Sequence, residues 1–171
     1  MAGLGLSELA KYGFVELEAT MPKLDQLVKA VGDSGRSALA ELGFSANPDQ
    51  ALNALLDLAE LDRGTVKKLL GKTDSAARLV RTLGASSAMV DLLRRRPEFL
   101  GVLDAKESKL PDLQAIRELF TKAAESKANS SEEKWVSIRL AYRKELLRLI
   151  AFDVTGGDAV ETCGLGAVAH V

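Results

Sequence analysis

The residues best suited to chemistry are few, and the densest charged group among them is Arg94-Arg95-Arg96. Adjacent guanidinium groups can hold a phosphate or another anion, because arginine donates hydrogen bonds in a planar fork. The run also precedes Pro97, where a helix is expected to end, and cations stabilise that end of a helix by roughly 0.3–1 kcal/mol each. No aromatic residue alternates with the arginines, so a base-stacking surface is not predicted. We favour the helix-end interpretation and keep an anion contact as the alternative.

Nucleophilic or metal chemistry would have to use Cys163 and His170, the only residues of their types. A lone histidine next to the terminal Val171 is poorly placed to act as the base of a serine triad. One cysteine and one histidine also fall short of the ligand set of a usual zinc site. We do not expect a catalytic Cys163–His170 pair. A single cysteine excludes an internal disulfide framework and fits a reducing compartment.

Glycine-rich and polar sets near the C-terminal end were also considered as sites. Gly156-Gly157-Asp158 lacks the Gly-x-x-x-x-Gly-Lys-Ser/Thr pattern of a phosphate loop, and no strand precedes it. We expect it to end one helix and cap another, and Gly164-x-Gly166 is equally weak. Arg143, with Tyr142 and Asp153, could form a buried polar set. Since Arg143 and Asp153 are nearly three turns apart, each is expected to meet a neighbouring element instead. We therefore assign no catalytic, cofactor-binding or metal-binding residue to this chain.

The overall composition is that of one globular domain: 171 residues, 47% hydrophobic and 27% charged. Lys and Arg (23) nearly balance Asp and Glu (24), and a net charge of −1 gives no general attraction to nucleic acid or anionic membranes. No apolar run approaches the about 20 residues that span a bilayer. The first residues lack the pattern of a signal peptide. We expect a cytoplasmic protein with no nucleic-acid or membrane partner.

Helical periodicity runs through the chain, and no segment alternates with period two for long enough to predict a strand. Asn47-Pro48 predicts a helix start, with Asn as cap and Pro in the first position. Asp62 or Thr65 is expected to begin the next helix, and Gly71 to end that helix. Gly84 is predicted to end another helix, and Ser86 or Ser87 to cap the next. Short helices with brief connections predict successive helical hairpins.

Further local expectations concern the same half of the chain. Residues 32–35 are predicted to form a loop. The similar stretches 7–14 and 37–44 each predict a short helix that ends at a glycine, followed by an apolar residue that folds back on the last turn. We expect the two helices to end in the same way, without forming a solenoid repeat. Thr73 or Asp74 is expected to cap a helix whose Arg78 and Arg81 point outward.

The longest predicted helix covers residues 132–154, and Pro111 opens a shorter one before it. Ser130 and Glu133 have the spacing of a capping box. The long helix carries two apolar stripes, which predicts contact with more than one neighbour and a buried Trp135. We therefore expect an all-α fold, an irregular bundle of short helical hairpins around this C-terminal helix. The expected parts are short helices in 1–45, a helical bundle in 46–160 and a divergent or truncated tail in 161–171.

Several stretches, taken in order, resemble one family. They are residues 39–44 (Leu-Ala-Glu-Leu-Gly-Phe), 47–52, 83–87 (Leu-Gly-Ala-Ser-Ser), 95–98 (Arg-Arg-Pro-Glu) and 141–153. Together they resemble the N-terminal helical part of glutamine synthetase adenylyltransferase, the bifunctional adenylyltransferase and adenylyl-removing enzyme, of the actinobacterial type. The resemblance covers roughly residues 36–160 and implies a nucleotidyltransferase domain following the tail.

The resemblance implies transfer of AMP from ATP to a tyrosine of glutamine synthetase, and its removal by phosphorolysis. It also implies control by the PII protein, and a Gly-Ser followed by an Asp-x-Asp pair that holds magnesium on ATP. This chain has no Asp-x-Asp, and no Gly-Ser precedes the acidic pairs Glu16-Leu17-Glu18 and Glu60-Leu61-Asp62. Magnesium and ATP are thus expected for the full-length enzyme and not for this chain.

We interpret the chain as an accessory scaffold, inactive alone, whose partners are the remaining adenylyltransferase polypeptide, glutamine synthetase and PII. The alternative is an independent helical module for protein–protein interaction. Nucleotidyltransferase motifs downstream in the same reading frame would favour the first interpretation.

Overall fold

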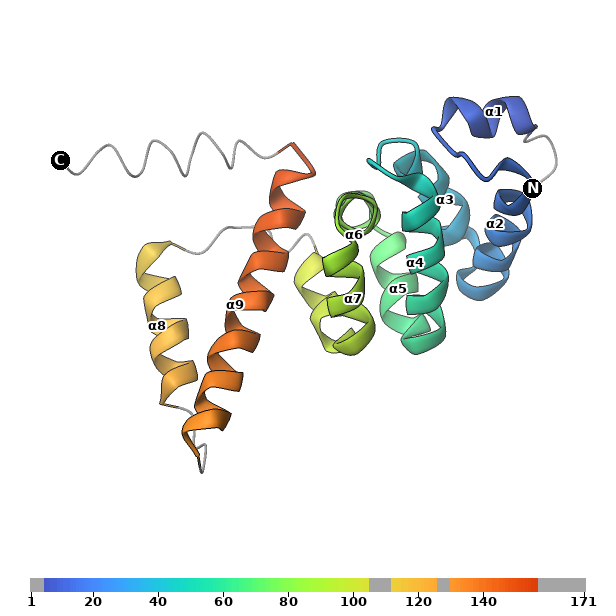
Figure 1. The fold of residues 1–171 in the computed structure, drawn as a ribbon. Coiled ribbons are helices and arrows are strands. Elements are labelled where there is room, and N and C mark those ends of the chain that lie inside the picture. Colours follow the sequence, from blue (N-terminus) through green and yellow to red (C-terminus); the bar gives the residue numbers. More distant parts are fainter. Residues whose placement is uncertain (1–4, 105–111, 126–129, 157–171) are drawn as a thin grey trace.

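The computed structural model describes residues 5–104, 112–125 and 130–156, and all regular structure within them is helical. The predicted all-α class is therefore confirmed. In chain order the elements are α1 (Leu6–Lys11), α2 (Leu17–Val31), α3 (Asp33–Leu42), α4 (Pro48–Leu61), α5 (Arg63–Leu70), α6 (Thr73–Ala85), α7 (Ser87–Arg95), the 3-10 helix η1 (Pro97–Leu103), α8 (Leu113–Ala124) and α9 (Ser131–Asp153). Figure 1 shows antiparallel pairs following one another, with the α8–α9 hairpin at the end opposite α1. Within the described residues, no helix has both the length and the hydrophobicity needed to cross a membrane.

One cluster of buried side chains runs from Leu9 in α1 to Ala151 in α9. Helices α4 and α6 lie at its centre, packed on each other and on the elements to either side. The inward face of α4 alternates alanines with leucines such as Leu52 and Leu55, both fully buried, and this lets α6 approach closely. Burying a leucine fully stabilises the fold by about 1.5–3 kcal/mol, so the contact between α4 and α6 contributes much of the stability of the core.

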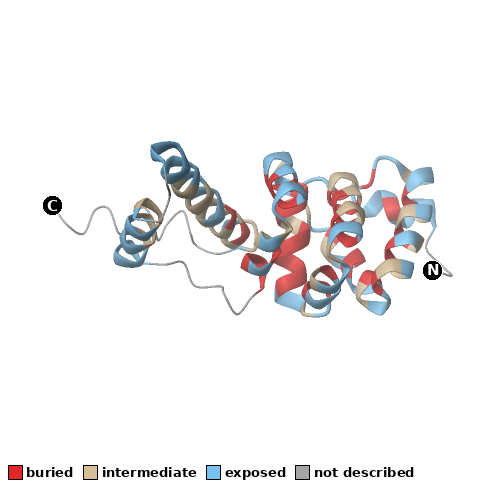
Figure 2. Ribbon diagram, turned by 90° about the horizontal axis from the view of Figure 1, so that it is seen from below, coloured by how far each residue is buried: buried red, intermediate tan, exposed pale blue. Residues whose placement is uncertain are grey.

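The long helix α9 is not the centre of the fold, which corrects the sequence-based expectation. Only Leu147 and Ala151 of α9 are buried, and Trp135 is 60% exposed. The second half of α9 packs on α6 and η1, whereas the first half leaves the core and pairs with α8 (Figure 2). Helix α8 itself buries no residue. The apolar residues of α9 are present as predicted, but Trp135, Val136, Tyr142 and Leu149 among them stay exposed.

Most predicted helix starts are confirmed by side-chain caps. Asn47 accepts a hydrogen bond from Gln50 N (2.9 Å), and Asp62 accepts one from Thr65 N (3.0 Å). At the later helices, Ser86 Oγ accepts from Met89 N and Ser130 Oγ from Glu133 N. Helix α6 is the exception, because Lys72 precedes it without a side-chain cap, and neither Thr73 nor Asp74 serves. Pro111 lies outside the described residues, and Asp112 caps α8.

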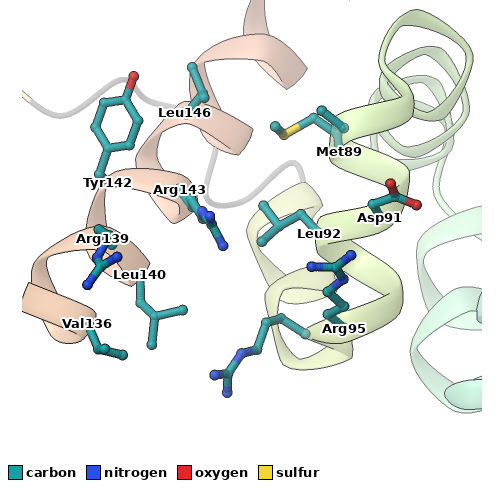
Figure 3. A pocket seen from close by; sticks show the side chains of 12 residues that line it. Met89, Asp91, Leu92, Arg95, Val136, Arg139, Leu140, Tyr142, Arg143 and Leu146 are labelled. Carbon is teal, nitrogen blue, oxygen red and sulfur yellow. The ribbon is translucent and has the colours of Figure 1, made fainter. Parts of the chain in front are cut away.

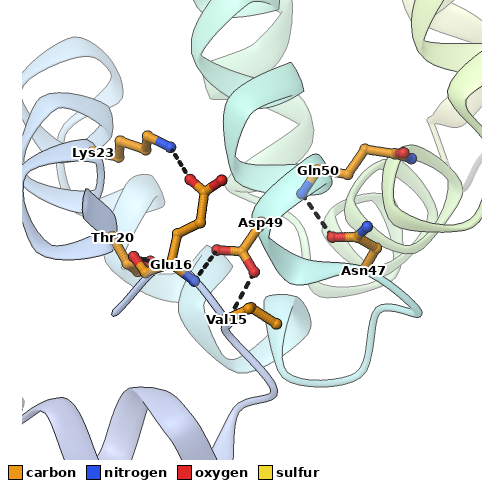
Figure 4. Close-up of polar contacts among 7 residues, drawn as sticks. All are labelled: Val15, Glu16, Thr20, Lys23, Asn47, Asp49 and Gln50. Atoms are coloured by element: carbon orange, nitrogen blue, oxygen red, sulfur yellow. Dashed lines mark hydrogen bonds and ion pairs between the residues drawn. The ribbon is translucent and has the colours of Figure 1, made fainter. Parts of the chain in front are cut away.

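Asp49, in the first turn of α4, does more than complement the helix dipole. Its carboxylate accepts hydrogen bonds from Val15 N at 2.8 Å and Glu16 N at 3.3 Å (Figure 4). Glu16 immediately precedes α2 and pairs with Lys23 at 2.9 Å. Asp49 therefore ties the start of α2 to the start of α4.

Two glycine expectations are wrong. Only Gly32 of the predicted 32–35 loop has a positive φ, of 72°, and α3 begins at the next residue. Gly84 does not end α6 but lies inside it and is buried. A Cβ at Gly84 would lie 2.7 Å from Ser45 Cβ and 3.0 Å from the carbonyl oxygen of Asn47. The glycine is needed because the chain before α4 passes directly against α6.

The helices in the two similar stretches end in different ways, so the prediction that they share one kind of C-terminal cap is wrong. Gly13 has a φ of 83° and Phe14 folds into the core, 4% exposed. Gly43 keeps a right-handed conformation, and Phe44 is 71% exposed. Phe44 instead lies under the guanidinium of Arg81, 5.2 Å from its ring centre.

The prediction that Arg78 and Arg81 point outward is also wrong. Arg78 is only 8% exposed, and burial lowers the pKa of its guanidinium while the nearby Asp74 opposes that shift. Arg81 is half-buried, and its Nη2 lies 2.8 Å from Glu41 Oε2, which links α6 to α3. Both side chains lie against α6's neighbours because α6 is surrounded on most sides.

Candidate functional site

A groove of about 720 Å³ lies between α7 and α9, at the point where the first half of α9 leaves the core. Its apolar lining comes from Met89 and Leu92 of α7 and from Val136, Leu140 and Leu146 of α9. Figure 3 shows the two helices as facing walls with these side chains between them.

The groove is open because its two walls are held independently. Helix α7 begins at its Ser86 cap and buries Val90 and Leu93 in the core, so its position is fixed from behind. Helix α9 is fixed at its other end, by Leu147 and Ala151. No described element lies in the wedge between them, and this leaves the groove open within the described part of the chain.

Arginines ring the groove. Arg95 and Arg96 come from the end of α7, and Arg139 and Arg143 from α9, and all four are exposed. Figure 3 shows Arg143 pointing from α9 towards α7, and Arg95 beside Leu92 on the α7 wall. Asp91 is the only carboxylate that lines the groove in the described structure. The site is therefore strongly cationic.

The groove arginines are weakly compensated. Arg96 pairs with Glu98 at 3.4 Å, and Arg139 Nε donates to the carbonyl oxygen of Trp135 at 3.2 Å. Within the described residues no ion pair involves Arg95 or Arg143. The third member of the arginine run, Arg94, points elsewhere and pairs with Asp57 of α4 and with Asp91.

The structure thus brings Arg95 and Arg96 of the arginine run together with Tyr142 and Arg143, although nothing in the sequence links these two sets. Asp153 is exposed and, as expected, forms no ion pair with Arg143. Arg143 faces the neighbouring helix α7 across the groove, and within the described residues neither side chain forms an ion pair. Sequence reasoning missed the groove as a unit because its walls are far apart in the chain. One signal was present: Val136, Arg139, Leu140 and Arg143 share a helical face.

The acidic pairs have structural roles. Glu16 forms the ion pair with Lys23 described above, and Asp62 caps α5. Hydrogen bonds from the side chain and the backbone N–H of Thr65 lower the pKa of Asp62. Within the described ranges, no three His, Cys, Asp or Glu side chains lie close enough to hold a metal ion together.

The remaining sequence candidates lie at the C-terminal end. Gly156 has a φ of 82° and follows α9, as expected of a helix stop. Gly157, Asp158, Cys163, Gly164, Gly166 and His170 lie outside the described residues, as does the predicted 161–171 tail.

The geometry defines a class of protein: an all-helical region with a groove that has an apolar floor and a cationic rim. Such a groove is suited to binding. The chain is 34% identical over 156 residues to the bifunctional glutamine synthetase adenylyltransferase/adenylyl-removing enzyme of Streptomyces avermitilis, covering 88% of this chain. It is 30% identical over 161 residues to the enzyme of the same name from Leifsonia xyli, covering 92% of this chain. The chain is therefore related to one region of the actinobacterial glutamine synthetase adenylyltransferases, which confirms the resemblance.

The match occupies a small part of each relative. The chain spans 16% of the Leifsonia xyli enzyme and 15% of the Streptomyces avermitilis enzyme. No family model matches the chain. No solved structure matches it either.

Proposed function

We propose that this chain is an accessory helical scaffold of an enzyme that adenylylates and deadenylylates glutamine synthetase, and that it is inactive alone. The observation that carries the proposal is the extent of the match, 88–92% of this chain against 15–16% of enzymes whose names state both activities. A region of that size leaves most of each relative to supply the chemistry.

The residues of the chain support the scaffold role. Adenylyl transfer needs a magnesium ion or cationic clamp on the ATP phosphates, and magnesium sites use carboxylates aimed from a rigid element. No two aspartates in the sequence have the Asp-x-Asp spacing. Asp49 and Asp62, which lie on rigid helix starts, already bind backbone N–H groups. In this proposal magnesium and ATP bind elsewhere in a cytoplasmic full-length enzyme, which also contacts PII.

The test is an assay for label transfer. Purified chain is incubated with magnesium, ATP labelled at the α-phosphate and glutamine synthetase, and in parallel with adenylylated glutamine synthetase and phosphate. We expect neither labelling nor phosphorolysis, while the full-length Streptomyces avermitilis relative serves as the positive control. Activity that stays with the chain through repurification would refute the inactive-scaffold assignment.

The second candidate function is an independent helical interaction module, and the groove between α7 and α9 is the observation that favours it. The two candidates differ in what is encoded downstream. Nucleotidyltransferase motifs in the same reading frame support the scaffold, and a stop codon directly after residue 171 supports the independent module.

A further inference from the structure

We propose that the groove between α7 and α9 docks an acidic amphipathic helix contributed by the remaining polypeptide of the adenylyltransferase. The inference rests on the proposed function for the identity of that polypeptide. The shape, polarity and charge of the groove support the kind of segment that binds there.

Charge complementarity requires an acidic occupant. Arg95 and Arg96 stand on one wall and Arg139 and Arg143 on the other, all exposed. Arg95 and Arg143 have no carboxylate partner within the described residues, and the groove's Asp91 already contacts Arg94 at 3.4 Å. A segment with glutamates or aspartates along both flanks would pair with both walls at once, which fixes its register.

The floor requires an apolar ridge on the same segment. Met89, Leu92 and Leu140 line the groove between the two rows of arginines. At its edge on α9, Val136 is 43% exposed and Tyr142 57%. An amphipathic helix that lays one face into a groove between two helices matches this arrangement of apolar floor and charged rim. The lined stretch of α9 from Val136 to Leu146 would accommodate about three turns of such a helix.

The walls argue against a nucleotide or free phosphate as the intended occupant. Phosphate sites usually combine cations with free backbone N–H groups at a helix N-terminus. Here the walls are the sides of α7 and α9, whose backbone N–H groups are bonded within the helices. Arg95 and Arg96 lie at the C-terminal end of α7, where the helix dipole is negative. The guanidinium groups lie at the rim, so they suit an extended partner better than an enclosed anion.

The adenylyltransferase polypeptide is the preferred source because of its length and its covalent connection to this region. The matched region is 16% of the Leifsonia xyli relative, so most of that enzyme's surface belongs to the rest of the same chain. A segment on the same polypeptide is present at an effective concentration in the millimolar range, which favours a modest docking surface. Trp135, which is 60% exposed, precedes the groove residue Val136 in α9 without lining the groove itself, so it is an accessible probe close to the site.

The chemistry of the site is tested with peptides. Trp135 is the only tryptophan of the chain, so its fluorescence reports events at this end of α9. The probe is a synthetic helical peptide of about three turns with leucines on one face and glutamates on both flanks. A version with lysine in place of glutamate and inorganic tripolyphosphate are the comparison ligands. We expect saturable binding of the glutamate peptide alone, weakening as salt rises.

Charge reversal locates the binding. The double variant Arg95→Glu/Arg143→Glu is expected to weaken binding of the glutamate peptide about tenfold or more. Lys144→Glu is the matched control, since Lys144 is exposed on the same helix but does not line the groove, and its affinity should be nearly unchanged. Circular dichroism verifies the fold of each variant. Equal losses in both variants, or tripolyphosphate binding without peptide binding, would overturn the proposal.

The source of the helix is tested in the full-length Streptomyces avermitilis relative by cross-linking and mass spectrometry. We expect cross-links between the region that matches α7 and α9 and an acidic helix elsewhere in the same polypeptide. Cross-links that form only after glutamine synthetase or PII is added would overturn the assignment to the same chain. Neither experiment measures adenylyl transfer, so failure here is distinguishable from failure of the proposed function.

Discussion

At the scale of single residues, several polar side chains have a clear structural role because they accept hydrogen bonds from backbone N–H groups. Asp49 bridges α2 and α4, while Asp62 and Asn47 cap their own helices. The caps join residues within one turn, so their spacing is visible in the sequence, whereas the hydrogen bonds that Val15 N and Glu16 N donate to Asp49 span more than 30 residues and are not. Carboxylates that bind backbone donors also make stability depend on pH.

Asp62 gives a prediction about pH. Its pKa is lowered in the folded chain by hydrogen bonds from Thr65, so its contribution to stability is complete above the unfolded value of about 3.9. The contribution is lost as the pH falls through the lower folded value. Asp62→Asn keeps a capping oxygen but cannot titrate, so its free energy of unfolding should fall less between about pH 7 and pH 3 than that of the unmodified chain.

Urea melts at both pH values measure the difference. Asp153→Asn is the control, because Asp153 is an exposed carboxylate for which the structure shows no hydrogen bond. The Asp153 variant should follow the unmodified chain. If Asp62→Asn loses as much stability as the unmodified chain on acidification, the cap is not pH-sensitive and the prediction fails.

At the scale of elements, helix existence and helix starts are local properties, and for that reason they could be predicted. A cap such as Ser86 acts within one turn, and the break before Pro97 follows from the ring of the next residue. The role of Gly84 was not local. Its requirement comes from Ser45 and Asn47, which the fold brings against α6, and no periodicity in α6 reveals them.

A substitution at Gly84 therefore tests whether packing outweighs intrinsic helix propensity. In an open helix, alanine would be favoured over glycine by about 1 kcal/mol. At this position the added Cβ would lie 2.7 Å from Ser45 Cβ, so Gly84→Ala should instead destabilise the chain by about 1–3 kcal/mol. Gly64→Ala is the matched control in α5, where the nearest atom to a new Cβ is 3.6 Å away. Denaturant melts in which both variants gain stability would contradict the close contact.

Helix α9 gives a second prediction at this scale, because its two ends differ in burial. Leu147→Ala removes a fully buried side chain and should cost about 2–5 kcal/mol. Trp135→Ala and Lys144→Ala change exposed residues and should each cost about 0.5 kcal/mol or little more. Chemical unfolding followed by circular dichroism measures all three. If Trp135→Ala lowers the free energy of unfolding as much as Leu147→Ala does, the whole of α9 is part of the core and the prediction fails.

At the scale of the whole molecule, burial decreases along the chain from α4 and α6 towards the α8–α9 hairpin. The apolar stripes of α9 predicted contact with neighbours, but a stripe does not state whether the neighbour lies in this chain. The groove could not be predicted from the sequence either. Arg95 and Arg143 line the same groove only because α7 and α9 are each anchored separately in the core. The proposed parts 1–45 and 46–160 stay a prediction, although side chains of both enter one buried cluster.

This gradient predicts the order in which the molecule opens. Local unfolding requires least free energy where few apolar side chains are buried, and α8 buries none. Backbone amides of α8 and of the first half of α9 should therefore exchange with deuterium fastest among the helices α2 to α9, and those of α4 and α6 slowest. The acidic peptide that fits the groove should slow exchange in the first half of α9 and in α7 while leaving α2 and α3 unchanged. Hydrogen-exchange mass spectrometry with and without the peptide measures both effects. Uniform exchange across all helices would show that the hairpin folds as one unit with the core, and protection confined to α2 and α3 would place the peptide elsewhere.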